Sequence, residues 1–325
     1  MALSVTSRLF RALCTPLLFA ELKVAFALRS LHRLTEASRS EMATHVQTVC
    51  YEAAEIIDPL VGDWDAFQVC FYTRREYKRD RRESRWDYGL QEISYPAIYS
   101  YFSRLSCEQQ DILLEDRDLM AFMVSLPRFP NLRTVRICFG GNFQRPFRWI
   151  VGRVLLGGQA CFPDQLEKIF RALLAAREHG VSIRTLEIRG YYPRRVVENV
   201  PLQKLARDAL SSIATVRIID SPAMLEFLGD VPLPCLRRCE LESCWLSVPN
   251  LERFVWAHRD TIRSLHLDDM WRLSEQTIED GIQLSFGSTT AILESIATIR
   301  ESGILNEFTM NRQPSGRFEI REAKD

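Results

Sequence analysis

The stretch Leu236-Arg237-Arg238-Cys239-Glu240-Leu241 is one copy of a six-residue phrase that recurs between Leu132 and Leu267. An aliphatic residue is followed by two mostly polar residues, an aliphatic residue or cysteine, a polar residue and a final aliphatic. The copies occupy residues 132–137, 183–188, 213–218, 236–241 and 262–267. Because successive side chains of a strand point to opposite faces, each copy predicts a short strand with one buried and one solvated face.

The spacing of the copies resembles that of leucine-rich repeats. From Ile183 onward the copies begin 23 to 30 residues apart, close to the repeat period in which one strand alternates with one helix or turn. The step from Leu132 to Ile183 is longer, at 51 residues. The copy at Leu236 continues to Cys244, where the repeat carries asparagine or cysteine. We therefore expect an α/β fold over residues 26–310, an irregular leucine-rich-repeat-like solenoid with a curved parallel sheet and outer helices.

The clearest repeat unit runs from Pro163 to Ile188. Asp164, with Glu167 three residues later, predicts a capped helix start, and Gly180 predicts a left-handed helix end. The expected buried stripe comprises Leu166, Ile169, Phe170, Leu173 and Leu174. A helix that returns so quickly to a strand, in one direction throughout, implies right-handed crossovers and a parallel sheet.

Other segments extend this pattern. We expect strands at residues 22–24 and 46–51, and helices at residues 95–117, 202–210, 251–255 and 292–299. Residues 58–95 read as a loop-rich insertion, residues 292–299 with 305–310 as a cap of the array, and residues 311–325 as a polar, frayed tail. Trp245, Trp256 and Trp271 are interpreted as packing residues in preference to interface residues, because each buries much surface.

Composition limits the function classes. The chain has 325 residues with 42 basic and 42 acidic side chains, so no net charge drives it to nucleic acid or to a membrane. Nine cysteines scattered through apolar runs indicate a reduced protein of the cytoplasm or the nucleus. Glu21 and Lys23 interrupt the apolar N-terminal run, so no membrane span is expected. The first 20 residues, with Arg8 and Arg11 and no acid, also fit a mitochondrial presequence.

A dense charge run lies at residues 74–85, with seven bases and three acids. A nuclear-import signal or a nucleic-acid contact would use such a run. The interspersed acids weaken its field. We therefore interpret the run as a solvated loop or helix face with internal ion pairs.

Patterns for catalysis or cofactor binding are incomplete. His258-Arg259-Asp260 begins like a kinase catalytic loop, but Leu265 stands where the partner asparagine is required. Five residues could ligate zinc, but a zinc site needs a compact second pair of ligands, and Cys239 and Cys244 are expected in the repeat core. The five residues are Cys235, Cys239, Cys244, His258 and His266. We therefore expect no enzyme, no cofactor and no metal.

The N-terminal residues 3–19 read L-S-x-T-S-R-x-F-R-A-L-x-x-P-L-L-F. This stretch resembles the second half of a filamentous-fungal F-box, the helix and turn that lead into the first repeat strand. The same F-box and leucine-rich-repeat family is echoed at residues 101, 108–113, 126–133, 244–246 and 251–267. The resemblance implies a partial F-box-like segment at residues 1–25 ahead of the repeats.

The resemblance further implies a substrate receptor of an SCF-type ubiquitin ligase, in which the repeats bind the client and the N-terminal segment binds a Skp1-like adaptor. The retained half of the docking element comprises Leu3, Leu9, Phe10, Leu13, Pro16, Leu17, Leu18 and Phe19. An F-box of this family opens with a further helix of the Leu-Pro-x-Glu-Ile-Leu type, which does not precede Met1 in this sequence. We therefore expect docking of a Skp1-like adaptor to this chain alone to be weak or absent.

The solvated strand positions define an expected concave surface for an unidentified protein client. It comprises Thr134, Arg136, Glu187, Arg189, Arg217, Arg238, Glu240, Glu242, His266 and Asp268. Their alternating sign suits a protein of complementary pattern better than a polyanion, unless they are only the solvated positions of the sheet. The alternative function is a scaffold independent of an F-box, whose N-terminal helix only caps the solenoid. Burial of Leu3, Phe10 and Leu13 would favour the scaffold, and an exposed apolar helix would favour the adaptor.

Overall fold

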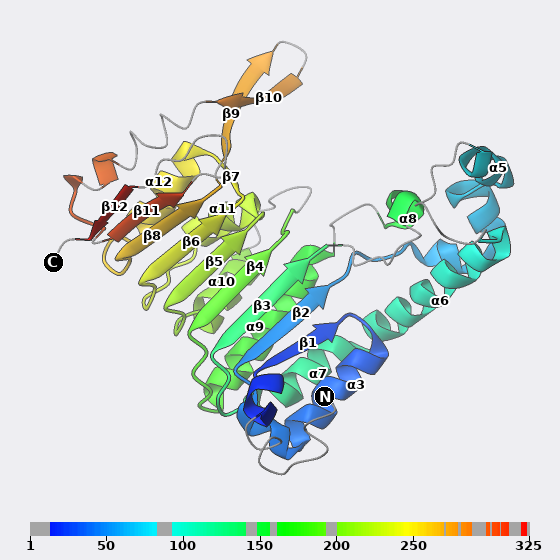
Figure 1. The fold of residues 1–325 in the computed structure, drawn as a ribbon, viewed down its shortest axis with the longest axis horizontal. Helices are drawn as coiled ribbons and strands as arrows, with labels where there is room; N and C mark the ends of the chain where they lie inside the picture. Colours follow the sequence, from blue (N-terminus) through cyan, green and yellow to red (C-terminus); the bar gives the residue numbers. More distant parts are fainter. Residues whose placement is uncertain are drawn as a thin grey trace.

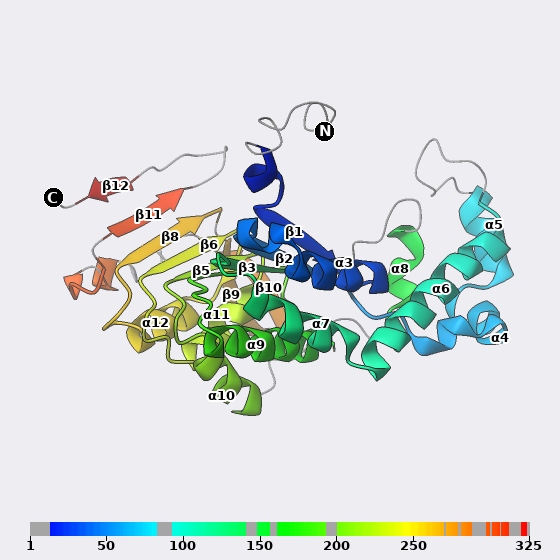
Figure 2. The same ribbon diagram turned by 90° about the horizontal axis from the view of Figure 1, so that it is seen from below.

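A computed structural model describes residues 14–82, 93–140, 148–156, 161–192, 200–269, 271–278, 281–287, 297–299, 301–305, 307–311 and 320–323. The centre of the molecule is a nine-stranded sheet with a layer of helices along one face (Figures 1 and 2). A helical insertion lies at one end of this body, and a separate three-stranded sheet lies near the other (Figure 1).

The strands of the large sheet lie side by side in chain order. They are β1 (Glu21–Ala25), β2 (Thr48–Ala53), β3 (Thr134–Phe139), β4 (Thr185–Arg189), β5 (Thr215–Ile219), β6 (Arg238–Glu242), β8 (Ser264–Asp268), β11 (Glu307–Asn311) and β12 (Ile320–Ala323). All neighbours are parallel except the last pair, β11 and β12. All five copies of the six-residue phrase supply a strand, and the predicted α/β fold with a parallel sheet and outer helices is confirmed.

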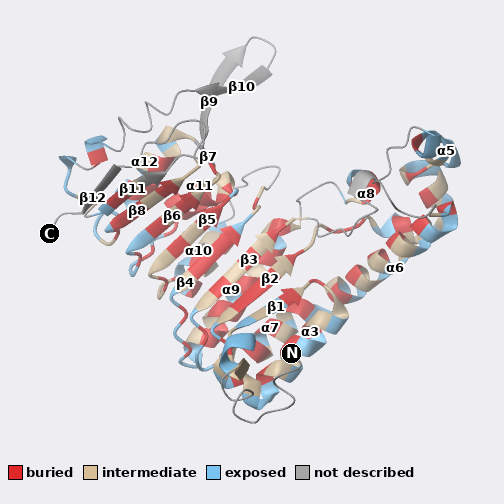
Figure 3. Ribbon diagram, viewed as in Figure 1, coloured by how far each residue is buried: buried red, intermediate tan, exposed pale blue. Residues whose placement is uncertain are grey.

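The register aligns equivalent positions of the five phrases. Val135, Leu186, Val216, Cys239 and Leu265 are successive Cα partners, and each is at most 1 % exposed. A slip of one residue would turn this whole row toward solvent, so the buried alternation fixes the pairing. Figure 3 shows the resulting buried positions running across the sheet.

A repeated turn follows four of these strands. The residue after β4, β5, β6 and β8 has a positive φ, namely Gly190, Asp220, Ser243 and Asp269. The Gly190 N–H donates to the carbonyl of Ile219 on the next strand at 3.0 Å, and the Asp220 and Ser243 N–H groups make equivalent bonds. Only glycine fits at position 190, because a Cβ there would lie 2.3 Å from the carbonyl oxygen of Phe139.

Small polar side chains then tie neighbouring repeats together. The Cys244 thiol is 1 % exposed and lies 3.5 Å from the carbonyl oxygen of Ile218 on the preceding strand. One repeat earlier, the buried Ser221 hydroxyl accepts from the Tyr191 N–H at 2.8 Å and donates to the Ile219 carbonyl at 2.8 Å. The repeat-core position predicted for Cys244 is confirmed.

The helices lie against the buried rows of the sheet (Figure 2). They are α3 (Leu28–Arg39), α7 (Arg117–Ser125), α9 (Phe162–Glu178), α10 (Val200–Ala209), α11 (Pro222–Gly229) and α12 (Val248–Ala257). One continuous hydrophobic core joins them to the strands, from Val24 on β1 to Phe308 on β11. Two 3-10 turns, η1 (Glu41–His45) and η4 (Leu126–Arg128), connect this layer to β2 and β3.

The helix α9 differs from its prediction at its start. It begins at Phe162, so Asp164 lies within the first turn and does not cap the helix. Pro163 explains the earlier start, because proline is favoured in the first helical turn. The N–H groups of that turn have no hydrogen-bond partner within the helix, so the N–H that proline lacks is not missed. The predicted stripe is buried except for Leu174, which is partly buried, and Gly180 ends the unit at φ +84° as predicted.

The insertion is helical where it is described, and the prediction of a loop-rich segment is wrong there. Its elements are η2 (Pro59–Gly62), α4 (Trp64–Ala66), the π-helical turn η3 (Phe67–Phe71), α5 (Arg74–Arg82) and the long α6 (Tyr95–Leu114), with α8 (Arg148–Val154) packed beside them. Its core is separate from that of the solenoid and is rich in aromatic residues, including Phe67, Tyr72 and Phe102. The apolar face of α6 covers this core, which explains why residues without a long periodic pattern still form helices.

The C-terminal predictions are also corrected. Residues 307–311 form β11, a further parallel strand beside β8, instead of a cap, and residues 320–323 form β12 within the expected frayed tail. The open edge of β8 offers unpaired N–H and C=O groups, and β11 satisfies them while burying Phe308. Of the expected helix at 292–299, residues 297–299 are described and are helical. The three-stranded sheet contains β7 (Trp245–Leu246), β9 (Trp271–Ile278) and β10 (Gly281–Gly287).

Candidate functional site

The face of the large sheet opposite the helix layer is left open by the described helices (Figure 2). Within the described residues no helix covers it, apart from a short helix at residues 14–18 beside β1. The ten predicted client contacts all occupy strand positions that alternate with the buried aliphatic rows. The structure therefore brings these ten residues together on one face.

Six of the open-face positions form a central row across the sheet. Its members are successive Cα partners: Cys50, Arg136, Glu187, Arg217, Glu240 and His266. Their charges alternate in sign from β3 to β6, because the fifth position of each phrase alternates between arginine and glutamate. A parallel sheet in register places these opposite charges on neighbouring strands, about 4.8 Å apart.

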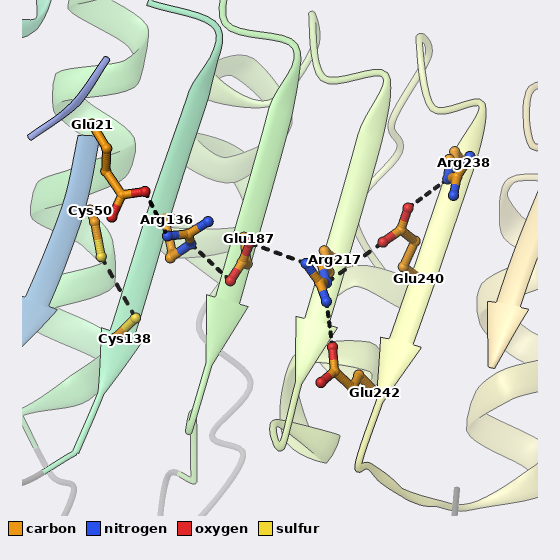
Figure 4. A network of polar contacts seen from close by, with 9 residues as sticks. All are labelled: Glu21, Cys50, Arg136, Cys138, Glu187, Arg217, Arg238, Glu240 and Glu242. Atoms are coloured by element: carbon orange, nitrogen blue, oxygen red, sulfur yellow. Dashed lines mark hydrogen bonds and ion pairs between the residues drawn. The ribbon is translucent and has the colours of Figure 1, made fainter. Parts of the chain in front are cut away.

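A chain of ion pairs follows from this arrangement, which we call the charge ladder (Figure 4). The Arg136 guanidinium lies 3.3 Å from a carboxylate oxygen of Glu21 and 2.9 Å from one of Glu187. Arg217 lies 3.9 Å from Glu187, and its other contacts are Glu242 at 2.5 Å and Glu240 at 3.6 Å. Arg238 completes the ladder at 2.6 Å from Glu240.

Burial is greatest at the centre of the ladder. The Glu187 side chain is 6 % exposed and lies between Arg136 and Arg217, which are 29 % and 39 % exposed. Burial works against charge on both arginines, yet the neighbouring carboxylates raise the pKa of each guanidinium above its usual value. The open face thus carries charges that are fixed and largely neutralised by one another.

Sequence reasoning predicted the alternating signs but missed the intramolecular pairing. It also missed Glu21 on β1, the acidic end of the ladder, because β1 was expected only as a strand. Arg189 differs from the ladder arginines: it is exposed on the open face and forms no ion pair within the described residues. Arg189 is therefore the open-face arginine most available to a partner.

The late end of the open face carries acidic side chains around His266. The Ser264 hydroxyl lies 2.6 Å from His266 Nε2, and Glu307 lies 3.8 Å from the same nitrogen. Burial, followed by the positive charge of Arg238, lowers the pKa of His266 below its usual 6.5, so this ring is neutral near pH 7. Burial and the nearby Glu242 raise the pKa of Asp268.

A hollow of about 450 Å³ lies at the early end of the ladder. Its lining includes Lys23, Cys50, Arg136, Cys138 and Arg189. The Sγ atoms of Cys50 and Cys138 lie 3.9 Å apart, as Figure 4 shows. Sequence reasoning found no sign of this pair, because the two cysteines are 88 residues apart and become neighbours only through the pairing of β2 with β3.

A second polar surface follows the N-terminal ends of the strands, and we call it the arginine edge. It consists of the second phrase residues Arg133, Arg184, Arg237 and Arg263, all exposed. A hollow of about 710 Å³ is lined by the last three of these together with Asp260. Within the described part of the chain none of the four forms an ion pair, and the Arg184 and Arg263 side chains donate to backbone carbonyls.

The predicted tether is described only in its second half. Pro16, Leu17, Leu18 and Phe19 are exposed, the last three by 80, 51 and 40 %. Leu3, Leu9, Phe10 and Leu13 lie outside the described residues. The exposed part is an apolar patch next to the β1 edge of the sheet, where Figure 2 places the first described residues.

The remaining predicted residues lie in varied surroundings. Trp245 and Trp256 are 38 % and 43 % exposed, so their interpretation as packing residues is wrong for these two. The side chain of Trp271 is not described. Cys239 is buried in the core, and the ring nitrogens of His258 lie 2.7 and 3.0 Å from the carbonyl oxygens of Phe254 and Val231. Among the described residues no group of three or more candidate ligands is placed to hold a metal.

The charge run is helical over Arg74–Arg82, and the two acids within these described residues are paired. Asp80 is 3 % exposed and interacts with Arg79 at 3.2 Å and with the Tyr72 hydroxyl at 3.3 Å. Glu76 pairs with Arg153 of α8 at 2.9 Å. The predicted helix is therefore confirmed over these residues, and the Arg79–Asp80 pair is internal as predicted. The face is not wholly solvated, because Asp80 is buried and Glu76 pairs with α8.

Comparisons with protein-family models, with curated proteins and with solved structures found no match for this chain. Within the described ranges, each helix lacks either the length or the apolarity that a bilayer crossing requires.

Proposed function

We propose that this protein is a non-enzymatic recognition module, a substrate-recognition adaptor of an SCF-type ubiquitin ligase in the cytoplasm or the nucleus. The observation that carries the proposal is the open face: eight parallel strands hold their polar side chains in register on one surface that the described helices leave uncovered. Binding a protein client there requires no reaction centre.

The dimensions of this surface suit a protein partner. Eight strands about 4.8 Å apart span about 34 Å, and five residues per strand span about 16 Å. The resulting area, on the order of 550 Å² before side-chain relief is counted, is similar to the roughly 800 Å² that each partner contributes to a standard interface.

The charge ladder favours a selective protein partner over a polyanion. It contains three arginines and four glutamates, so its positive charges are already balanced. A partner protein gains binding energy from the ladder only where its own charges are opposite to those of the fixed, alternating row. This arrangement favours selective binding over attraction of any strongly charged molecule. Arg189, outside the ladder, adds an exposed contact at its early end.

The apolar patch at Leu17, Leu18 and Phe19 supports the adaptor over the free-standing scaffold. Exposed large apolar residues next to each other are typical of interaction sites. A helix that only capped the solenoid would turn such residues toward the first repeat, whereas Leu17 is 80 % exposed.

Co-purification with a Skp1-like adaptor tests this proposal. The full chain, alone and with any upstream coding extension, is mixed with the purified adaptor, and bound adaptor is quantified. We expect weak or no capture by the chain alone and clear capture by an extended form. Leu18→Asp with Phe19→Asp should reduce that capture at least tenfold, because charge in an apolar contact removes the burial that drives binding. Leu60→Asp, at a 59 % exposed leucine of the insertion, is the matched control. Absence of capture by both forms of the chain would exclude the ligase role.

Client binding is tested in the same captured complex. Arg189→Glu reverses an exposed charge on the open face without disturbing an ion pair of the ladder, and Arg133→Glu makes the same change at the arginine edge. We expect ubiquitinated clients to be lost with Arg189→Glu and retained with Arg133→Glu. Equal loss in both variants would place the client elsewhere.

A further inference from the structure

Two cysteines meet on the open face although the ligase proposal gives them no role. Cys50 lies on β2 and Cys138 on β3, and the register pairs Cys50 with Arg136 and Glu52 with Cys138. The two cysteines are therefore diagonal neighbours on one face, with their Sγ atoms 3.9 Å apart (Figure 4). This distance places the thiols in hydrogen-bond contact.

The pair lies in the wall of a hollow lined by four cations and two carboxylates, Glu52 and Glu187, and Cys50 itself is 4 % exposed. Both cysteines line the hollow of about 450 Å³, and Lys23, Arg136 and Arg189 line it with them. Cys239 and Cys244, by contrast, are enclosed in the solenoid core. A small reagent reaches the pair through this hollow, where Cys138 is partly exposed, and a thiol beside cations is the environment in which cysteine becomes reactive.

The two thiols differ in acidity. The hydrogen bond from Cys138, followed in effect by the charge of Arg136, lowers the pKa of Cys50 to about 7 even though burial opposes ionisation. The same hydrogen bond and burial raise the pKa of Cys138 well above its usual value. Cys50 is thus the more acidic thiol of the pair, and Cys138 is its hydrogen-bond partner.

We propose that Cys50 and Cys138 form a peroxide-oxidisable dithiol that closes to a disulfide between β2 and β3. The Cys50 thiolate attacks one oxygen of hydrogen peroxide, the O–O bond breaks, and Cys50 sulfenic acid and hydroxide result. The Cys138 thiol then attacks the sulfenic sulfur, the S–O bond breaks, and water leaves with the thiol proton. Two electrons pass from the two thiols to one peroxide.

Closure requires the two Sγ atoms to approach from 3.9 Å to about 2.05 Å. Both side chains line the same hollow. Because diagonal neighbours on adjacent strands lie about 7–8 Å apart, closure combines side-chain rotation with an approach of the β2 and β3 backbones. The disulfide removes the thiolate that lies beside Arg136. Oxidation therefore changes the charge at the early end of the charge ladder, whether or not the face binds a ligase client.

Mass spectrometry of the full reduced chain tests the proposal. The chain is treated with increasing hydrogen peroxide, free thiols are blocked with N-ethylmaleimide, and the peptides are separated without reduction. We expect a Cys50–Cys138 linked peptide, lighter by two hydrogens than its separate parts, at peroxide levels that leave the exposed Cys70, Cys107 and Cys235 reduced. Preferential oxidation of those three, or an unlinked pair, would overturn the proposal.

Two variants separate the roles of the thiols. In Cys138→Ser, Cys50 should stop at sulfenic acid and be trapped by dimedone, whereas in Cys50→Ser, Cys138 should stay unmodified. In the unmodified chain, iodoacetamide should label Cys50 with a midpoint near pH 7, below the roughly pH 8.5 of an ordinary cysteine. A midpoint at the ordinary value, or dimedone labelling of Cys138 in Cys50→Ser, would contradict the assignment and leaves the adaptor-capture result unaffected.

Discussion

The charge ladder on the open face and the arginine edge at the strand starts are built by the same repeat, yet their electrostatics differ. At the fifth phrase position the residues alternate as Arg136, Glu187, Arg217 and Glu240, and each charge meets its opposite on the next strand. At the second position arginine recurs without an acidic neighbour. Because both rows stack in the same register, the signs of the residues at each position decide whether a charged row is neutralised or stays open.

The two rows also differ in what their charges contribute to stability. Glu187 is buried between the guanidinium groups of Arg136 and Arg217. Removal of one arginine therefore leaves the Glu187 carboxylate only partly paired and poorly hydrated. The arginine edge is exposed. Its Arg184 and Arg263 side chains donate hydrogen bonds to backbone carbonyls, and all four side chains are accessible to solvent. A buried pair that is broken costs far more than an exposed charge that is removed.

The largest expected effect tests this contrast directly. Arg136→Met should lower the free energy of unfolding by about 2–3 kcal/mol, below the roughly 3–5 kcal/mol of a fully buried pair because Arg217 remains near Glu187. Arg133→Met, three residues earlier and exposed, should change it by less than about 0.5 kcal/mol. Urea unfolding at equilibrium measures both.

A double variant serves as the control for that result. Arg136→Met combined with Glu187→Leu should recover part of the loss, because no unpaired carboxylate is then buried. Equal destabilisation by Arg136→Met and Arg133→Met would mean that the ladder is no more than a solvated surface.

A smaller effect is expected at the arginine edge. Changing Arg133, Arg184, Arg237 and Arg263 to glutamine should shift elution from a cation exchanger to lower salt, with the salt slope reduced by about one per lost contact. A dispersed control changes Arg29, Arg75, Arg128 and Arg207 to glutamine and alters the net charge equally. The dispersed variant should elute later than the edge variant, and coincident elution would show that the edge does not act as one surface.

The smallest effect concerns pH at the late end of the open face. The pKa of His266 is lowered in the folded chain, so the unfolded chain binds more protons below its usual pKa of 6.5. The contribution of the neutral His266 ring to the free energy of unfolding is therefore fully present above pH 6.5. It is lost as the pH falls from there through the lowered pKa of the folded chain. His266→Gln should flatten this part of the curve of unfolding free energy against pH, and an unchanged curve would contradict the neutral assignment.

Much of the repeat architecture could be predicted because it depends on local pattern. Each phrase buries its fourth and sixth residues, and this alternation identified the strands at 132–137, 183–188, 213–218, 236–241 and 262–267 in the correct order. Of the insertion, the helix expected at residues 95–117 is confirmed by α6, but the remaining elements could not be predicted in the same way. Its helices are short or lack a long periodic face, and contacts with Phe67, Tyr72 and α6 stabilise them instead.

The amino-acid sequence by itself determined the strand phrases, their polar faces and the alternating signs at the fifth position, because these depend on residues within one unit. Only the tertiary structure decided that Arg136 and Arg217 hold Glu187, that the four edge arginines stand together, and that Cys50 meets Cys138. The physical reason is that side-chain pairing across a parallel sheet depends on register between segments up to 88 residues apart, which no single segment encodes.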